Sequence, residues 1–160
     1  MSRLTAIILA AGKGTRMKSS RSKVLHEVCG RPMLSYVVDA ARSAGAEDIV
    51  LVINPEMIAV KDLFQDTVQY VFQEQQLGTG HAVQMAEGLI GNQPGEVLVL
   101  CGDTPLLTGD LLTDMIGLHH QTQAAATVLT AKLDDPTGYG RIIRSATGSV
   151  ERIVEERDAT

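Results

Sequence analysis

The chain has 160 residues, a net charge of −5, 44% hydrophobic residues and two cysteines. This length fits one domain on the usual scale of ~100–200 residues and can bury a core without disulfides or metals. The acidic balance argues against a nucleic-acid partner, and every apolar run is well short of the ~18 residues that insert across a bilayer. With no leader-like segment, we expect a cytoplasmic protein whose Cys29 and Cys101 are small buried thiols.

Strand-like and helix-like segments alternate along the chain. An apolar run predicts a buried strand over residues 5–9, and the i, i+3, i+4, i+7 spacing of Leu34, Val37, Val38 and Ala41 predicts a helix. The further expected strands cover 49–53, 68–72, 96–100 and 126–133; the further expected helices cover 55–64, 80–90 and 111–116, the last capped by Thr108. Short strands follow from Arg141. This order indicates an α/β fold with a mainly parallel sheet covered on both faces.

Ligands of such sheets bind outside the carboxyl ends of the strands. That rule places the loops beginning at Ala10, Gln73, Cys101 and Asp134 on one rim. The charge pattern points to the same rim, because six lysines and arginines fall between residues 13 and 31, where the only acid is Glu27. This concentration indicates a local anion site, and the alternative is a solvated charged loop.

The first loop, "LAAGKGTRM" at residues 9–17, predicts a phosphate site. Its glycines allow close backbone approach and a concave set of N–H donors, to which Lys13 and Arg16 would add charged donors. The spacing is not that of a Walker loop, and Met17 stands where a dinucleotide-binding motif has its third glycine. Lys23 lies close enough in sequence to reach the same phosphates, unless it is an ordinary surface lysine.

Two later loops offer groups of a different kind. In "QEQQLGTGHA", residues 73–82, the Gln73 amide suits the edge of a pyrimidine, Gly78 admits a flat ring, and Thr79 offers a hydroxyl or a helix cap. We interpret His81 as a packed or capping histidine rather than a base. In "LVLCGDTPLL", Asp103 either holds Mg²⁺ or caps the turn at Thr104.

Six motifs in this order and spacing carry a resemblance: "LAAGKGTRM", "KVLH", "QLGTGHA", "GDTPLL", "DPTGYGRI" and "IVEERDA". The chain resembles, over essentially its whole length, the uridylyltransferase domain of the bacterial bifunctional N-acetylglucosamine-1-phosphate uridylyltransferase/glucosamine-1-phosphate acetyltransferases. The first motif alone is typical of all sugar nucleotidyltransferases, and the later ones are more specific. The resemblance implies a three-layer, Rossmann-like nucleotidyltransferase fold.

The resemblance also implies a reaction and its residues. UTP and N-acetylglucosamine 1-phosphate would give UDP-N-acetylglucosamine, a precursor of peptidoglycan and lipopolysaccharide, and pyrophosphate. Arg16 and Lys23 would be catalytic, Gln73 and Gly78 would read uracil with Thr79 nearby, and Asp103 would bind Mg²⁺. Gly140 and Glu155 would hold the N-acetylglucosamine moiety. The remaining substrate-binding positions would be Leu9, Ala10, Ala11, Gly12, Lys13, Gly14, Cys101 and Gly102.

The chain departs from the family in three respects. Ser22 stands where the family commonly has proline, and Cys101 where some members have tyrosine. The family domain continues past residue 160 to supply two further asparagines, and a β-helix acetyltransferase domain then drives trimer formation. We therefore expect residues 1–160 to be part of a nucleotidyltransferase domain that keeps the nucleotide pocket and turns over poorly.

Three other interpretations remain at this point. A nucleotidyltransferase for another sugar phosphate or phosphorylated acceptor would share the first motif. A non-catalytic nucleotide-binding regulatory domain would be expected to lack Lys23 or Asp103, and both are present. A flavodoxin-like or dinucleotide-binding domain conflicts with the glycine spacing.

Overall fold

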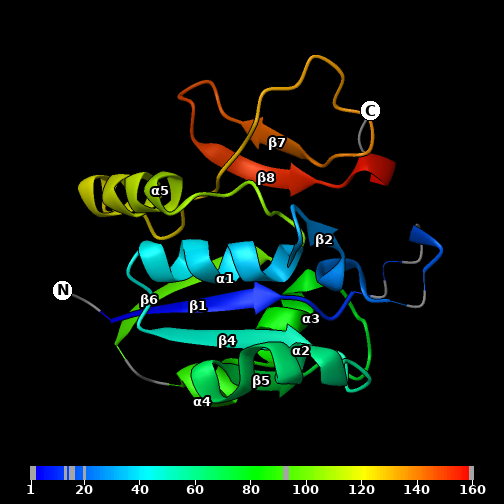
Figure 1. Cartoon of the computed structure of the whole chain (residues 1–160). Coiled ribbons are helices and arrows are strands. Elements are labelled where there is room, and N and C mark those ends of the chain that lie inside the picture. Colours follow the sequence, from blue (N-terminus) through cyan, green and yellow to red (C-terminus); the bar gives the residue numbers. More distant parts are fainter. Residues whose placement is uncertain (1–2, 13, 15–16, 20, 92–93, 159–160) are drawn as a thin grey trace. The chain divides into compact units, whose positions relative to one another are not determined.

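The computed structural model describes residues 3–12, 14, 17–19, 21–91 and 94–158. The chain forms two compact units, which divide between Gln121 and Thr122. The first unit contains the parallel sheet and its covering helices, and the second contains a β-hairpin (Figure 1). No described helix is long and apolar enough to cross a membrane.

The first unit is built on a four-stranded parallel sheet with the strand order β5-β4-β1-β6. In this register Leu9 pairs with Val52 on one side and with Cys101 on the other. The strands therefore end at one edge, and the chain passes from one side of β1 to the other between β5 and β6. The bounds are Arg3–Leu9 for β1, Asp48–Ile53 for β4, Gln69–Phe72 for β5 and Gly95–Cys101 for β6.

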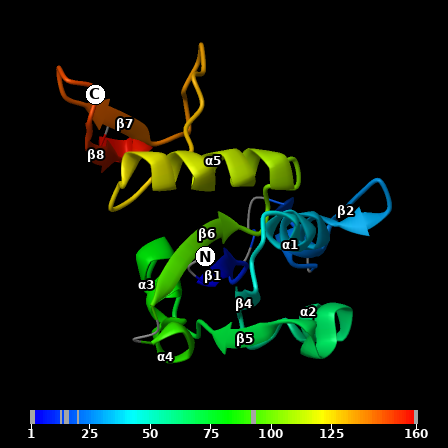
Figure 2. The same ribbon diagram turned by 90° about the vertical axis from the view of Figure 1, so that its left-hand side faces the viewer.

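Helices cover both faces of this sheet, as the end-on view of Figure 2 shows. Buried residues of α1, α2 and α5 pack with Ala6 and Ile8 on one face. Residues of α3 and α4 pack with Ile7 on the other face. The helices are α1 (Met33–Ser43), α2 (Ile58–Phe64), α3 (Thr79–Gln84), α4 (Glu87–Ile90) and α5 (Gly109–Thr122). The prediction of a three-layer α/β fold is confirmed.

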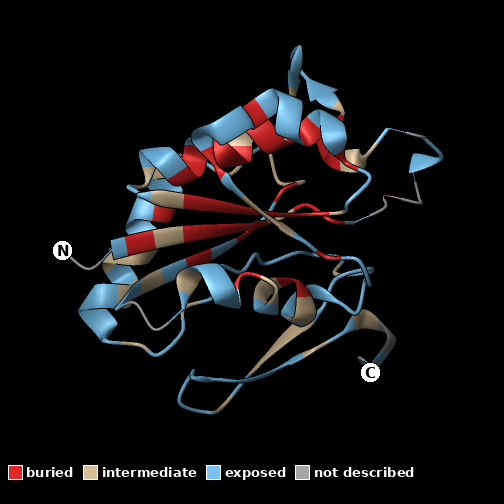
Figure 3. Ribbon diagram, turned by 90° about the horizontal axis from the view of Figure 1, so that it is seen from below, coloured by how far each residue is buried: buried red, intermediate tan, exposed pale blue. Residues whose placement is uncertain are grey.

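Apolar periodicity explains why these segments fold as they do. Successive residues of β1 point to opposite faces, so a strand without polar alternation is buried on both sides. Leu34, Val37, Val38 and Ala41 form one buried stripe of α1, as their spacing predicts. In Figure 3 the buried residues lie along the central strands and on the helix sides that face them.

Two sequence-based expectations about elements are wrong. The helix expected over 80–90 is two short helices, because Met85 and Ala86 form a turn between α3 and α4. The strand expected over 126–133 does not form, and none of the described strands pairs with this segment. A strand requires a ladder partner, which a propensity pattern does not specify. The Thr108 cap is confirmed, because its hydroxyl accepts a bond from the Leu111 N–H at 3.3 Å.

The second unit differs in having no buried residue among those described. It is an antiparallel hairpin of β7 (Arg141–Arg144) and β8 (Val150–Val154), followed by a single 3₁₀ turn at Glu156–Asp158. A smaller hairpin of β2 (Glu27–Val28) and β3 (Arg31–Pro32) belongs to the first unit, after a 3₁₀ turn at Lys23–Leu25. A third 3₁₀ turn, Gln65–Thr67, follows α2.

Candidate functional site

A cleft of about 570 Å³ lies in the first unit, at the carboxyl ends of β1 and β6. The strand order reverses between these two strands, which is where open α/β sheets bind ligands. The cleft is lined by Leu9, Ala10, Ala11, Gly12, Gly14, Met17, Lys23, Val24, Gln73, Gln76, Gly78, Thr79, Ala82, Cys101 and Asp103.

The structure brings together most of the residues that the sequence nominates for nucleotide binding. The loops beginning at Ala10, Gln73 and Cys101 meet around this one cleft, as the rim rule predicts. The rule does not apply to the fourth loop, because the strand expected before Asp134 does not form. Lys13 and Arg16 lie outside the described residues. Gly140 and Glu155 belong to the second unit, so they are considered with that unit below.

The glycine loop touches the segment that carries Lys23. Gly14 has a φ of +59°, and a Cβ atom built on it would lie 2.8 Å from the Cβ of Lys23. Only glycine adopts such a φ without strain and leaves room for this contact. The loop thereby places the base of the Lys23 side chain beside the cleft rather than in open solvent.

Lys23 and Asp103 form an ion pair inside the cleft. The Lys23 Nζ atom donates to Asp103 Oδ2 at 2.7 Å, although the two residues are 80 positions apart. Both side chains are partly exposed, so a pair of this kind contributes only about 0–1 kcal/mol to stability. Its importance is positional, because it places a cation and a carboxylate at one point of the cleft.

Asp103 does not act as the turn cap that its sequence context allows. Its carboxylate is bonded to Lys23, and the turn after β6 is closed by the Thr104 hydroxyl, which donates to the Cys101 carbonyl at 2.6 Å. In the described part of the chain, no group of three or more His, Cys, Asp or Glu side chains could hold a metal ion. A single carboxylate suits Mg²⁺ that takes its other ligands from waters and phosphates.

The Gln73 side chain is held in a fixed position at the cleft wall. The residue is 4% exposed, and its amide nitrogen donates to the Gly78 carbonyl at 3.1 Å. The same nitrogen lies 3.0 Å from His81 Nδ1. His81 therefore packs beside Gln73, and Thr79 is the first residue of α3 rather than its cap, which is Gly78.

Of the two neighbouring residues predicted to bind substrate, Cys101 lines the cleft and Gly102 does not. Cys101 is exposed and lines the cleft, so the expectation of a buried thiol is wrong there, as it is for the exposed Cys29. Partial desolvation, and then the nearby Asp103, raise the pKa of the Cys101 thiol. Gly102 is buried behind the cleft, where an added Cβ would lie 3.1 Å from the Leu9 carbonyl oxygen. It permits close packing of β6 against β1 and does not line the cleft.

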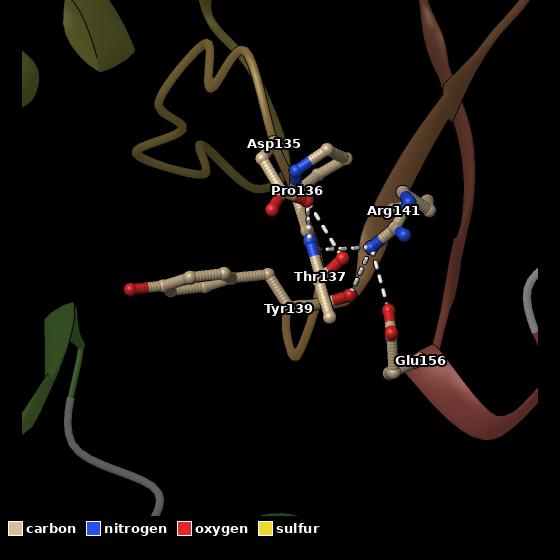
Figure 4. A network of polar contacts seen from close by, with 6 residues as sticks. All are labelled: Asp135, Pro136, Thr137, Tyr139, Arg141 and Glu156. Atoms are coloured by element: carbon tan, nitrogen blue, oxygen red, sulfur yellow. Dashed lines mark hydrogen bonds and ion pairs between the residues drawn. The ribbon is translucent and has the colours of Figure 1, made fainter.

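In the second unit, polar contacts hold the turn before β7 (Figure 4). Arg141 Nη1 donates to the Pro136 carbonyl at 2.9 Å and to the Tyr139 carbonyl, and lies 2.9 Å from a Glu156 carboxylate oxygen. A backbone bond from Gly138 and the charge of Arg141 lower the pKa of Glu156. Two bonds from Thr137 lower the pKa of Asp135.

This network brings together the ends of the hairpin that carry Gly140 and Glu155. Arg141 pairs with Val154, and a Cβ on Gly140 would lie 3.3 Å from the Val154 carbonyl oxygen. The two residues assigned to the sugar by the resemblance thus lie at the same end of one hairpin. Whether they bind a sugar stays a prediction.

Sequence reasoning missed three contributions to these sites. Gln76 donates to the Ala11 carbonyl at 2.7 Å and so joins two walls of the cleft. Met17 and Val24 add apolar lining. Glu156, not Glu155, is the partner of Arg141. The sequence shows several glutamines close together in residues 73–76 and two adjacent glutamates at 155 and 156. It does not indicate which of them makes a contact.

Comparison with known proteins agrees with this geometry. The model of the MobA-like NTP transferase domain matches residues 6–158. The chain belongs to this family. It is also 55% identical over its whole length to the protein named Bifunctional protein GlmU of Halalkalibacterium halodurans, and 49% identical to that of Thermoanaerobacter pseudethanolicus. It spans 35% of the length of each, and the expected resemblance is confirmed.

Solved structures support the NTP transferase fold. A UDP-glucose pyrophosphorylase complexed with UDP-glucose superimposes with a TM-score of 0.75 at 24% identity, covering 98% of this chain and 69% of that one. Rv0371c from Mycobacterium tuberculosis H37Rv gives a TM-score of 0.63 at 22% identity, covering 73% and 60%. Its complex with manganese gives 0.60 at 22% identity, covering 73% and 59%. At these identities the likeness shows the fold alone.

Proposed function

We propose that this chain binds UTP in the cleft of the first unit and transfers its uridylyl group to N-acetylglucosamine 1-phosphate. The products are UDP-N-acetylglucosamine and pyrophosphate. The observation that carries the proposal is the convergence of the glycine loop, Lys23, Asp103 and Gln73 on one cleft at the point where the strand order reverses. The whole-length similarity to proteins named Bifunctional protein GlmU supports this choice of substrates.

The reaction needs no nucleophile from the protein. A phosphate oxygen of the sugar phosphate attacks the α-phosphorus of UTP, the bond to the β-phosphate oxygen breaks, and pyrophosphate carries away the electron pair. Catalysis of this kind depends on positioning and on charge stabilisation. Backbone N–H groups of the glycine loop and the Lys23 ammonium supply positive potential at the triphosphate. Lys13 and Arg16 are expected to add to it.

Asp103 would hold Mg²⁺, which when bound neutralises phosphate oxygens. Lys23 occupies the same carboxylate in the free protein. The Lys23 ammonium, beside this carboxylate, would be close enough to donate to a phosphate oxygen. Gln73 and Gly78 would contact uracil, with Thr79 nearby. Gly140 and Glu155 would contact the N-acetylglucosamine moiety.

The longer relatives support a proposal about the wider role of the chain. We propose that the chain works as part of a cytoplasmic, trimeric enzyme that also carries a β-helix acetyltransferase domain and serves peptidoglycan and lipopolysaccharide synthesis. In that setting the remaining portion of the nucleotidyltransferase domain supplies further contacts to the metal and the sugar.

Titration calorimetry tests this proposal directly. We expect the 160-residue chain to bind UTP in the presence of Mg²⁺ and to release pyrophosphate slowly with N-acetylglucosamine 1-phosphate. Glucose 1-phosphate and the other nucleoside triphosphates serve as comparisons. If the chain prefers another base or sugar, the proposed substrates are wrong. If a well-folded chain gives no heat with any nucleotide, the proposal that it binds a nucleotide is wrong.

A further inference from the structure

Gln73 is a buried polar side chain whose hydrogen-bonding pattern is fully determined by its neighbours. The Gly78 carbonyl also accepts the Ala82 N–H at 3.1 Å, and a carbonyl oxygen can only accept. The Gln73 group that lies 3.1 Å from it must therefore be the NH₂ nitrogen and not the carbonyl oxygen. This contact favours one of the two orientations of the amide.

The second amide proton then determines the state of His81. The Gln73 nitrogen lies 3.0 Å from His81 Nδ1, and a hydrogen bond across this distance requires Nδ1 to accept. This contact therefore requires the His81 tautomer that carries its proton on Nε2. Were the amide to rotate by half a turn, the Gln73 oxygen would face two acceptors, the Gly78 carbonyl and His81 Nδ1.

With both amide protons engaged, Gln73 has only its carbonyl oxygen left to offer a ligand. None of the described residues donates to that oxygen. An acceptor suits the N3–H group of uracil. Cytosine presents an unprotonated N3 at that position, so the same contact would set two acceptors against each other. A site built to pair one hydrogen-bonding pattern rejects the opposite pattern strongly.

We propose that His81 is a specificity-determining residue, which holds the Gln73 amide so that the cleft accepts uracil and rejects cytosine. His81 acts through Gln73 and is a positioning residue. The inference rests on the proposed uracil contact, and goes further by naming the group that sets its polarity. Among the described residues, removing the His81 acceptor would leave the Gly78 carbonyl as the single acceptor that opposes rotation of the amide.

The first test compares variants of the 160-residue chain by titration with UTP and CTP. His81→Leu removes the acceptor, and His81→Asn keeps an oxygen near the position of Nδ1. Because the variant loses one neutral hydrogen bond, we expect His81→Leu to lower the UTP-over-CTP preference about 2- to 13-fold. His81→Asn should retain most of that preference. His120→Leu, on α5, is the matched control and should leave it unchanged.

The second test does not involve a nucleotide. A long-range ¹H–¹⁵N spectrum of the free protein should show the His81 proton on Nε2 and two protected Gln73 side-chain protons. A proton on Nδ1 would overturn the inference. So would full UTP preference in a folded His81→Leu variant, with the proposed function still standing. Equal binding of UTP and CTP by the unaltered chain would overturn both the uracil contact and the role of His81.

Discussion

The two units of this chain are stabilised in different ways. The first unit has fully buried aliphatic side chains on both faces of its sheet, and its cleft opens at the end of that rigid layer. The second unit has no buried residue among those described and is held by Arg141, Glu156 and Asp135. Apolar burial thus supports the candidate nucleotide site, and exposed polar contacts support the turn that carries Gly140.

The largest expected difference between the units is in stability. Leu51 is fully buried in β4, so Leu51→Ala should lower the free energy of unfolding by about 2–5 kcal/mol. Leu133, in the second unit, is 44% exposed. Leu133→Ala should change the free energy of unfolding by no more than about 0.5 kcal/mol. Urea unfolding followed by circular dichroism measures both. Equal effects would show that the units are not stabilised differently.

Lys23 tests whether the charges of the first unit act on the reaction. We expect Lys23→Ala in the full-length enzyme to lower kcat about 10²–10³-fold, because it removes a charge-stabilising donor at the triphosphate. The KM for UTP should change modestly. Pyrophosphate release measures this effect, and Arg144→Ala, in the second unit, is the control. A near-normal kcat would remove Lys23 from the mechanism.

Gly14 tests the contact that positions Lys23. Gly14→Ala places a methyl group 2.8 Å from the Lys23 Cβ and strains a residue whose φ is +59°. We expect UTP affinity to fall about tenfold, or about 1.4 kcal/mol.

Gly30→Ala separates strain from displacement, because Gly30 has a φ of +77° and no atom within 4 Å of an added Cβ. Gly30→Ala should lower the free energy of unfolding about as much as Gly14→Ala does, and it should leave UTP affinity unchanged. The same loss of affinity in both variants would mean that backbone strain, rather than displacement of Lys23, explains the effect.

The smallest effect concerns pH and is confined to the second unit. Glu156 and Asp135 have lowered pKa values in the folded chain. Their contribution to the stability of the second unit is therefore complete above the ordinary pKa values of 4.5 and 3.8. It is lost as the pH falls through the lower, folded-state values. We expect the cross-strand NMR contacts of Ile142 and Ile153 to weaken in that range. Glu156→Gln should weaken them already at neutral pH and reduce the dependence on pH.

The difference between the units also explains what could be predicted from the sequence. Strands β1, β4, β5 and β6 and helix α1 follow from apolar periodicity, which reports burial. The rim rule then places Gly12, Lys23, Gln73 and Asp103 around one cleft. In the second unit, which has no buried residue among those described, the result is mixed: the short strands expected from Arg141 form as β7 and β8, whereas residues 126–133 have strand propensity but pair with none of the described strands.

Side-chain contacts were beyond the reach of pattern alone. The Lys23–Asp103 pair spans 80 residues, and the sequence indicates neither its distance nor its existence. The choice of Glu156 over Glu155 depends on which carboxylate the 3₁₀ turn presents to Arg141. Similarly, the polarity of the Gln73 amide depends on the positions of the Gly78 carbonyl and His81.

The central claim is that the cleft of the first unit binds UTP. The most direct measurement is a ¹H–¹⁵N spectrum of the labelled chain during titration with UTP and Mg²⁺. We expect the largest shifts at the backbone amides of Gly12, Gly14 and Gly78, and little change at Gly45 and Gly91, which precede the amino ends of β4 and β6. Unchanged Gly12, Gly14 and Gly78 signals at saturating UTP would contradict the account.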